Sequence, residues 1–457
     1  MPYENQYGSK TAHIDIVKNP DVQKFLKQCA PIKHPTDVGT QELLKYFKNA
    51  PDYDNECIVQ HVIASDGSKY TSSINEQLPS IKAAYLKFST ILIEMSDFDG
   101  LQDLQTELID PFKVASLQKN RDALSLVLPL SNLKLPEDES VRDTFRKQTE
   151  RFLLSEETRF KVDNNETSLL HTLTELALLR PGSNGKVRVH KCPQQNCDHG
   201  EILLDPTKSA HKCPRCEKPV YFSDCLRLWE VINDFHSNEE AISRFMIYME
   251  HLLPVHYLRF LRDFFADRLE QVGLLIDGPL AIFGQAAWLH SSIMSFVKKL
   301  IDKQKNANKN GPLVIGLQKT GYVVEYMNLL QKRVKSNQIF LITDEFRYKY
   351  LGVGRSGNGF GYETYYGQEF AFKTPSGKMF VFSLPYPLEN KTSGFVKEKE
   401  NFQNYHSIKR VLRLITEVET DLFKNAVIPI ALAHKYAAIS LNPGGRVLDI
   451  LGRASIG

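Results

Sequence analysis

Short apolar runs and amphipathic segments alternate along most of the chain. Strand-like apolar runs occupy residues 57–63, 84–94, 273–277, 313–317 and 379–384. Apolar residues recur at helical spacing over 166–179, after 237, and over 283–304, 322–334, 404–424 and 428–440. Strands come first and then alternate with helices, so the pattern predicts a mixed α/β sheet flanked by helices.

Turn and breaker residues set the expected boundaries of these elements. The sequence Ala64-Ser65-Asp66-Gly67-Ser68 is typical of a turn after the first strand. Residues 119–165 are charged and contain Pro129 and Pro136, so we expect a loop and a surface helix there. Pro254 is expected to kink or break the long helix that opens near Ser237.

Composition excludes several classes of protein. The 457 residues are 42% hydrophobic and 24% charged, as in a soluble globular protein. Lys and Arg number 57 against 54 Asp and Glu, so any contact with DNA must come from a local patch. No apolar run approaches the length of a membrane span, and the N-terminus does not resemble a secretory signal. We therefore expect a cytoplasmic protein with no membrane contact.

Four of the seven cysteines fall in one short stretch. Four residues separate Cys192 from Cys197, and two separate Cys213 from Cys216. Two such knuckles bring four thiolates to the corners of a tetrahedron, which suits Zn²⁺. Because all four ligand positions are cysteines, the pattern predicts a structural zinc ribbon and not a catalytic zinc site. Cys225 lies on an apolar stretch and is expected in the core.

Two aspartates stand next to apolar runs, and each is followed by glycine. Asp66 follows the strand candidate 57–63, and Asp277 ends the strand candidate 273–277. Carboxylates at the end of a strand point into a crevice where they can hold a pair of Mg²⁺ or Mn²⁺ ions about 4 Å apart, the arrangement that cuts phosphodiesters. Asp-Gly is also ordinary turn chemistry, so both interpretations stay open at this point.

Four sequence blocks together resemble the NurA nuclease family. They are Ala64-Ser65-Asp66-Gly67-Ser68, Leu274-Leu275-Ile276-Asp277-Gly278-Pro279-Leu280, Val314-Ile315-Gly316-Leu317-Gln318-Lys319-Thr320 and Ile428-Pro429-Ile430-Ala431-Leu432-Ala433-His434-Lys435-Tyr436-Ala437. The blocks occur in the family's order and cover most of residues 57–440. The chain departs from the family in its inserted ribbon, and in reading Asn425-Ala426-Val427 where the family has an aromatic hydroxyl.

The resemblance implies an RNase H-like fold and cleavage of DNA with two Mn²⁺ or Mg²⁺ ions. It assigns Asp66 and Asp277 as metal ligands on two strands and Glu250 as a ligand on the first long helix. Glu240 competes for that role, but its place three residues after Ser237 indicates a capping box. His434 is the late ligand or positions the scissile phosphate. Without the family context, a core histidine would look the same.

Basic residues near the second aspartate are candidates for phosphate contacts. Lys319 follows an apolar strand and is expected near the crevice, where it can stabilise charge on the phosphate. Two further groups form either a DNA groove or a solvated surface: Lys298, Lys299, Lys303, Lys305 and Lys309, and then Lys332, Arg333 and Lys335. Asp344 is expected first as a helix N-cap and only second as a site residue.

The expected organisation is an N-terminal helical region (1–52), a nuclease core in two parts (53–185 and 228–457) and the ribbon insertion (186–227). No phosphate-binding loop of an ATPase is present. The resemblance implies a homodimer that works with a HerA-type hexameric ATPase in DNA end processing or phage defence. Two alternatives remain: a non-catalytic adaptor that binds DNA or a partner, and a nuclease that acts on RNA.

Overall fold

A computed structural model describes residues 11, 13–29, 37–57, 59–98, 101, 114, 121–422, 425–439 and 444–456. Residue 58 of the first expected strand and residues 119–120 of the expected loop lie outside this part of the chain.

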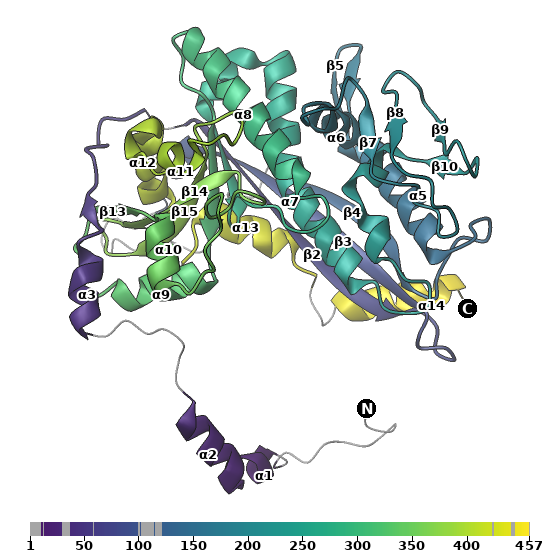
Figure 1. Ribbon diagram of the computed structural model, residues 1–457, viewed down its shortest axis with the longest axis horizontal. Coiled ribbons are helices and arrows are strands. Elements are labelled where there is room, and N and C mark those ends of the chain that lie inside the picture. The colour runs from purple at the N-terminus through teal and green to yellow at the C-terminus, as the bar shows by residue number, and fades with distance from the viewer. Residues whose placement is uncertain are drawn as a thin grey trace.

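A nine-stranded mixed sheet runs through the described residues (Figure 1). Its order is β1-β13-β14-β15-β12-β11-β2-β3-β4. β11 lies parallel to both β2 and β12, and the other neighbouring strands are antiparallel. The strands are β1 (Lys48–Asn49), β2 (His61–Ser73), β3 (Lys82–Glu94), β4 (Arg121–Ser131), β11 (Val272–Asp277), β12 (Leu313–Gln318), β13 (Gln338–Leu341), β14 (Gly367–Lys373) and β15 (Met379–Pro385).

Helices cover both faces of this sheet, which confirms the predicted mixed α/β class (Figure 1). One face packs against α5 (Val141–Leu154), α6 (Leu169–Leu178), α7 (Glu239–Phe264) and α8 (Trp288–Asn306). The opposite face packs against α12 (Ile408–Val418) and α13 (Ile428–Ala437). A separate core at the β13 end is formed with α3 (Asp37–Leu44), α9 (Tyr322–Leu330) and α10 (Asp344–Tyr350).

The remaining helices are short or lie toward the ends of the chain. α11 (Phe395–Lys399) follows β15, and α14 (Arg446–Ile456) contacts β2. α1 (His13–Lys18) and α2 (Pro20–Gln28) contribute no buried residue. None of the described helices is long and apolar enough to cross a membrane.

The first strand is longer than predicted, and the expected turn within it is wrong. β2 continues from His61 to Ser73, so Asp66 lies within the strand and not at its end. Each of these residues pairs with β3 in unbroken register, including Asp66 with Ser89 and Gly67 with Phe88. The partner strand supplies backbone hydrogen bonds all along this segment, and they outweigh the local turn preference of Asp-Gly-Ser.

A strand that the sequence did not indicate closes one edge of the sheet. β4 includes Pro129, where a loop was expected. Proline is tolerated because β3 is the one strand among the described residues that pairs with β4, and the register shifts beside Pro129, between Lys82 and Ala83. The helix that follows, α5, buries Phe145, Phe152 and Leu153 and is therefore part of the core.

The long helix runs through its proline, and its start differs from the prediction. α7 continues from Glu239 to Phe264 with Pro254 inside it, so the helix is not broken. Its N-cap is Asn238, without a side-chain capping bond, and Glu240 pairs with Arg244. The capping box expected from Ser237 and Glu240 is therefore wrong.

Asp344 begins a helix but does not cap it. Thr343 is the N-cap of α10, and its hydroxyl accepts a hydrogen bond from the amide of Phe346. Asp344 is buried one residue later, with a carboxylate oxygen 2.5 Å from the ammonium of Lys399. This aspartate therefore forms a buried ion pair within the protein.

The cysteine-rich segment packs onto the face of the sheet that α5, α6, α7 and α8 cover. Its strands are β7 (Val187–Val189), β8 (Ile202–Leu204), β9 (His211–Lys212) and β10 (Pro219–Val220), and a separate hairpin, β5 (Phe160–Val162) with β6 (Asn165–Thr167), precedes it. Cys192, Cys213 and Cys225 are buried in the same apolar core as α5–α8. The segment is thus joined to the main body by a shared core.

Candidate functional site

Three candidate residues converge at the centre of the sheet. One carboxylate oxygen each from Asp66 and Asp277 and one ring nitrogen of His434 all lie within 4.8 Å of one another. The two aspartates are 211 positions apart in the sequence, and the sheet alone brings them together. The structure therefore places three groups with metal-binding chemistry side by side.

The register of two parallel strands explains this convergence. Ile276 of β11 lies opposite Ser65 of β2, so the next residue on each strand, Asp277 and Asp66, falls on the same face. That face is the one that α13 covers, as the burial of Ala64 and Leu275 in the same core shows. The alternation of side chains along each strand thus directs both carboxylates toward α13.

His434 reaches the aspartates from α13. Its Nδ1 lies 2.6 Å from Oδ2 of Asp66, and the hydroxyl of Ser68 donates a hydrogen bond to the carbonyl of Ala437 at the end of the same helix. The His434 side chain is 64% exposed, whereas that of Asp66 is 7% exposed. The alternative that His434 is a core histidine is therefore wrong.

Lys319 lies on the other side of Asp277. It follows β12, which is parallel to β11, and its Nζ is 2.6 Å from Oδ2 of Asp277. Burial raises the pKa of Asp277 above its ordinary value, although the Lys319 ammonium opposes this rise. The sequence placed Lys319 near the crevice, and the structure brings it into direct contact with an acid of the cluster.

Glu250 approaches from the opposite face of the sheet. It lies on α7, and an Oε1 atom is 3.1 Å from the position that a Cβ atom on Gly67 would occupy. Burial raises the pKa of Glu250 to about 8, and the charges of Asp66 and Asp277 add to this rise. Glu250 is not in the group whose ligand atoms lie within 4.8 Å of one another. It is nevertheless close enough for the charges of both aspartates to raise its pKa.

Gly67 is a residue whose role the sequence did not reveal. Its amide donates a hydrogen bond to Oδ1 of Asp66, 2.8 Å away, and the same amide opposes the rise in the pKa of Glu250. A Cβ at this position would also lie 3.1 Å from the ring of Phe88. Because Gly67 lies within a regular strand, glycine is favoured there by the space that Glu250 and the Phe88 ring occupy and not by an unusual backbone angle.

The chemistry of this cluster fits a divalent cation. Carboxylate oxygens suit Mn²⁺ and Mg²⁺, and imidazole is a common ligand of transition metals. Asp66, Asp277 and His434 would hold the ion, and Glu250 lies behind Asp66 as a further carboxylate. Lys319 is a cation already in contact with the cluster, where an anionic substrate would need charge compensation.

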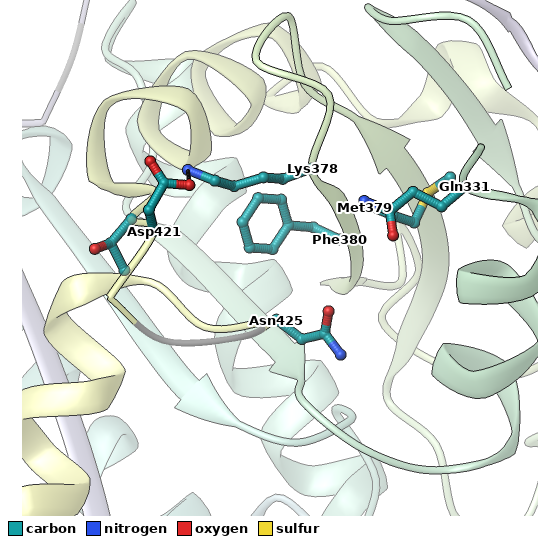
Figure 2. A pocket seen from close by; sticks show the side chains of 7 residues that line it. Gln331, Lys378, Met379, Phe380, Asp421 and Asn425 are labelled. Atoms are coloured by element: carbon teal, nitrogen blue, oxygen red, sulfur yellow. Dashed lines mark ion pairs between the residues drawn. The ribbon is translucent and has the colours of Figure 1, made fainter. Parts of the chain in front are cut away.

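A hollow of about 300 Å³ lies between the start of β15 and the segment that contains Asp421 and Asn425 (Figure 2). Gln331, Lys378, Phe380 and Asn425 contribute to its lining. The Asn425 side-chain amide donates a hydrogen bond of 3.4 Å to the backbone carbonyl of Lys319. One residue that lines the hollow therefore contacts the backbone of Lys319.

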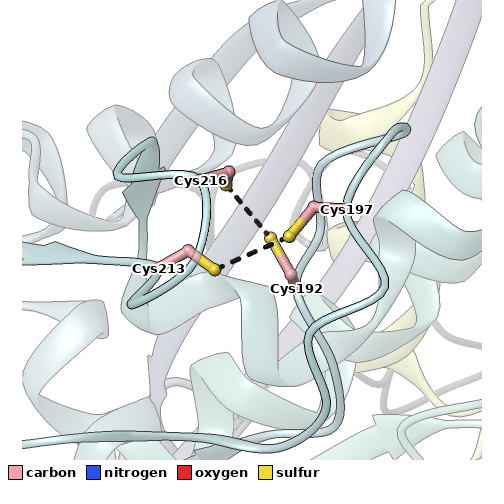
Figure 3. Close-up of side chains that lie close together, drawn as sticks. All are labelled: Cys192, Cys197, Cys213 and Cys216. Carbon is pink, nitrogen blue, oxygen red and sulfur yellow. Dashed lines mark hydrogen bonds between the residues drawn. The ribbon is translucent and has the colours of Figure 1, made fainter.

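The four predicted zinc ligands form a second cluster (Figure 3). The sulfur atoms of Cys192 and Cys216 are 3.7 Å apart, and those of Cys197 and Cys213 are 3.8 Å apart. Four sulfurs at about 2.3 Å from a central Zn²⁺ would be about 3.8 Å apart in a tetrahedron. Burial raises the pKa of Cys213, but the amides of Cys216 and Arg215 outweigh this effect and lower it to about 7. The geometry fits a tetrahedral metal ion.

Much of the first expected basic group is paired with acids. Lys298 contacts Asp302, Lys309 contacts Asp267 at 2.6 Å, and Lys299 contacts Glu389 at 3.0 Å. These partners neutralise the local charge, which favours a solvated surface over a DNA groove for this part of the group.

Comparison with known proteins supports the resemblance. Residues 60–263 match the NurA domain, a span that contains Asp66 and Glu250. The crystal structure of the NurA nuclease from Sulfolobus solfataricus aligns with this chain at 10% sequence identity and a TM-score of 0.31. The alignment covers 97% of this chain and 94% of that chain. A structure of NurA with manganese is 11% identical with a TM-score of 0.29, covering 97% and 98%. No curated protein matches. Because both TM-scores are low, only the domain match bears on the resemblance.

Proposed function

We propose that this chain, whose residues 60–263 match the NurA domain, is a nuclease that hydrolyses DNA with the help of divalent metal ions. The observation that carries the proposal is the convergence of Asp66, Asp277 and His434 within 4.8 Å. These residues come from two strands and a late helix, and a shared cation would explain why two carboxylates lie together in a largely buried position.

Each residue of the cluster has a proposed role. Asp66, Asp277 and Glu250 are metal ligands, with two ions as the expected number, and His434 is a further ligand or positions the scissile phosphate. When bound, the ions activate a water molecule and stabilise charge on the leaving oxygen. Lys319 orients the phosphate and compensates its negative charge, because its ammonium already lies at the edge of the cluster.

The direct test is cleavage of DNA by variants that keep the shape of the site. Asp66→Asn and Asp277→Asn are expected to abolish Mn²⁺-dependent cleavage and to leave the melting temperature of the metal-free protein close to that of the wild type. Asp302→Asn is a matched control, because this half-exposed aspartate pairs with Lys298 on α8. Full activity in both site variants would contradict the proposal.

Two other outcomes would point to the alternative functions. DNA binding without hydrolysis, with or without an ATPase partner, would indicate a non-catalytic adaptor. Faster cleavage of an RNA of matched sequence would indicate a ribonuclease. Both substrates therefore belong in the same assay.

We further propose a homodimer that works with a HerA-type hexameric ATPase, in DNA end processing or phage defence. This proposal rests on the resemblance alone. It predicts that the chain sediments as a dimer and that such an ATPase raises its rate of DNA cleavage. A monomer whose cleavage is indifferent to the ATPase would contradict it.

For the cysteine cluster, we propose a structural Zn²⁺ ion. All four ligands are thiols, and two of them lie in the main core, so the ion would stabilise the fold. Elemental analysis is expected to give one zinc per chain. Cys213→Ser is expected to lose that zinc, whereas Cys29→Ser, at an exposed position, is expected to retain it.

A further inference from the structure

A buried serine lies across from Asp66 on the neighbouring strand. Ser89 of β3 pairs directly with Asp66 of β2 in the antiparallel register. Residues paired in this way point to the same face of the sheet, with their Cβ atoms about 4.5–5.5 Å apart. That face is the one that α13 covers, because Ile91, two residues further along β3, is buried in the core that α13 helps to form. The Ser89 side chain therefore lies beside that of Asp66.

The Ser89 hydroxyl has no hydrogen-bond partner among the residues that the structure describes. Ser89 is 1% exposed, so its hydroxyl is also shielded from solvent. A buried hydroxyl without a partner lowers stability, because it gives up its hydrogen bonds to water and gains none in return. Alanine would occupy the same position without this cost. Packing alone therefore does not explain a serine here.

Two other donors close to Asp66 in the sequence already have acceptors. The amide of Gly67 donates a hydrogen bond to Oδ1 of Asp66. The hydroxyl of Ser68, which lies on the same face of β2 as Asp66, donates to the carbonyl of Ala437. The hydroxyl of Ser89 differs from both, because within the described residues it lacks an acceptor.

Cation binding would change the hydrogen bonds that Asp66 needs. Nδ1 of His434 now lies 2.6 Å from Oδ2 of Asp66. If both residues bind one cation, the lone pairs that face each other in this contact are used for coordination. Carboxylates that ligate a metal are held in orientation by hydrogen bonds from neighbouring groups. A hydroxyl on the paired strand can supply such a hydrogen bond.

We propose that Ser89 is a positioning residue for the cation site, and that its hydroxyl donates a hydrogen bond to the Asp66 carboxylate when the cation is bound. The inference rests on the proposed function, in which Asp66 is a metal ligand. It adds to the site a residue that neither the sequence pattern nor the family resemblance indicated. Ser89 acts through Asp66 and is not itself a ligand.

The test measures Mn²⁺ binding and stability instead of cleavage. In calorimetry with Mn²⁺ alone, Ser89→Ala is expected to bind about tenfold more weakly than the wild type, because the ligating carboxylate loses a hydrogen bond. In EDTA the same variant should melt at the wild-type temperature or above it, since it removes a buried hydroxyl that has no partner. A lower melting temperature in EDTA would show that Ser89 supports the fold, and would refute the proposal.

Two further variants separate the hydrogen bond from packing. Ser89→Cys keeps the shape of the side chain but replaces the hydroxyl with a weak donor, so it should show the same loss of Mn²⁺ affinity as Ser89→Ala. Ser292→Ala is the matched control. Ser292 of α8 is also buried and also lacks a partner within the described residues, but it lies in the helical layer on the opposite side of the sheet. This control should bind Mn²⁺ as the wild type does.

The outcomes distinguish the role of Ser89 from the proposed function. Wild-type Mn²⁺ affinity in Ser89→Ala or in Ser89→Cys would refute the positioning role. An equal loss in Ser292→Ala would refute it too, because the effect would then not depend on the place of the hydroxyl. A wild type that binds no Mn²⁺ would instead contradict the proposed metal site, and the role of Ser89 with it.

Discussion

The residues of the candidate site differ in how readily the sequence predicts them. Asp66 and Asp277 stand beside apolar runs, so a strand with an acid near it could be predicted for each. Gly67 was interpreted as a turn glycine, because the crowding that favours glycine there comes from other elements, including Glu250, 183 positions away. A contact of that kind leaves no local pattern.

The contact between Gly67 and Glu250 predicts the effect of adding one methyl group. Gly67→Ala is expected to displace the Glu250 carboxylate and to weaken Mn²⁺ binding about tenfold, as do other changes around metal ligands. Calorimetry with the metal alone measures this effect.

A second substitution identifies the cause. The added Cβ would crowd both Glu250 and the Phe88 ring, at 3.1 Å each. Gly67→Ala/Phe88→Leu relieves the crowding at the ring and leaves the carboxylate displaced, so weak Mn²⁺ binding should persist. Recovery of wild-type affinity in this double variant would show that Gly67 serves packing alone.

Burial of Glu250 predicts a dependence of stability on pH. Its pKa is raised from the ordinary 4.5 to about 8, so between these values the folded metal-free chain holds a proton that the unfolded chain has lost. This group therefore stabilises the fold less as pH rises from 5 to 8. Urea unfolding in EDTA should show the free energy of the wild type falling relative to Glu250→Gln over this range. A constant difference between the two proteins would contradict the raised pKa.

For helices and strands, predictions from the local sequence pattern were wrong where a neighbouring element determined the conformation. β4 was not predicted, because Pro129 and the surrounding charges indicate a loop. At the edge of the sheet a strand pairs on one side, so it tolerates a residue without a backbone N–H donor. The helix α7 passes Pro254 because it is packed between the sheet and α6, with Leu252, Leu253 and Val255 buried. The buried strands β11 and β12 were predicted within one residue, since continuous apolar runs are typical of strands covered on both faces.

A buried ion pair joins the ribbon segment to the helical layer. Arg146 of α5 donates to both carboxylate oxygens of Asp224, at 2.8 and 2.7 Å, and both residues are buried. Arg146→Ala would leave the Asp224 charge without this partner, at an expected cost of about 3–5 kcal/mol in the free energy of unfolding.

The control for this pair is an ion pair on the ribbon surface. Arg215 and Asp198 are both exposed, so Arg215→Ala is expected to cost less than about 1 kcal/mol. Denaturant unfolding of the two variants measures the difference. Equal costs would show that the Arg146 pair does not hold the ribbon segment on the body.

For the whole molecule, the sequence was informative about class and less so about arrangement. The mixed sheet, its flanking helices and the close approach of four cysteines were predicted and are present. The convergence of Asp66, Asp277 and His434 could be proposed only through the family resemblance, because it depends on strand order and on which face α13 covers. The hollow at the start of β15 is built from three separate segments, and no pattern along the chain indicated it.

The central claim is that Asp66 and Asp277 share a divalent cation. Anomalous diffraction at the manganese edge, from crystals soaked in Mn²⁺, tests it most directly. We expect a peak within coordination distance of a carboxylate oxygen from each aspartate and of a ring nitrogen of His434. Manganese bound elsewhere, with these two carboxylates left without an ion under saturating Mn²⁺, would show that the two aspartates do not share a cation.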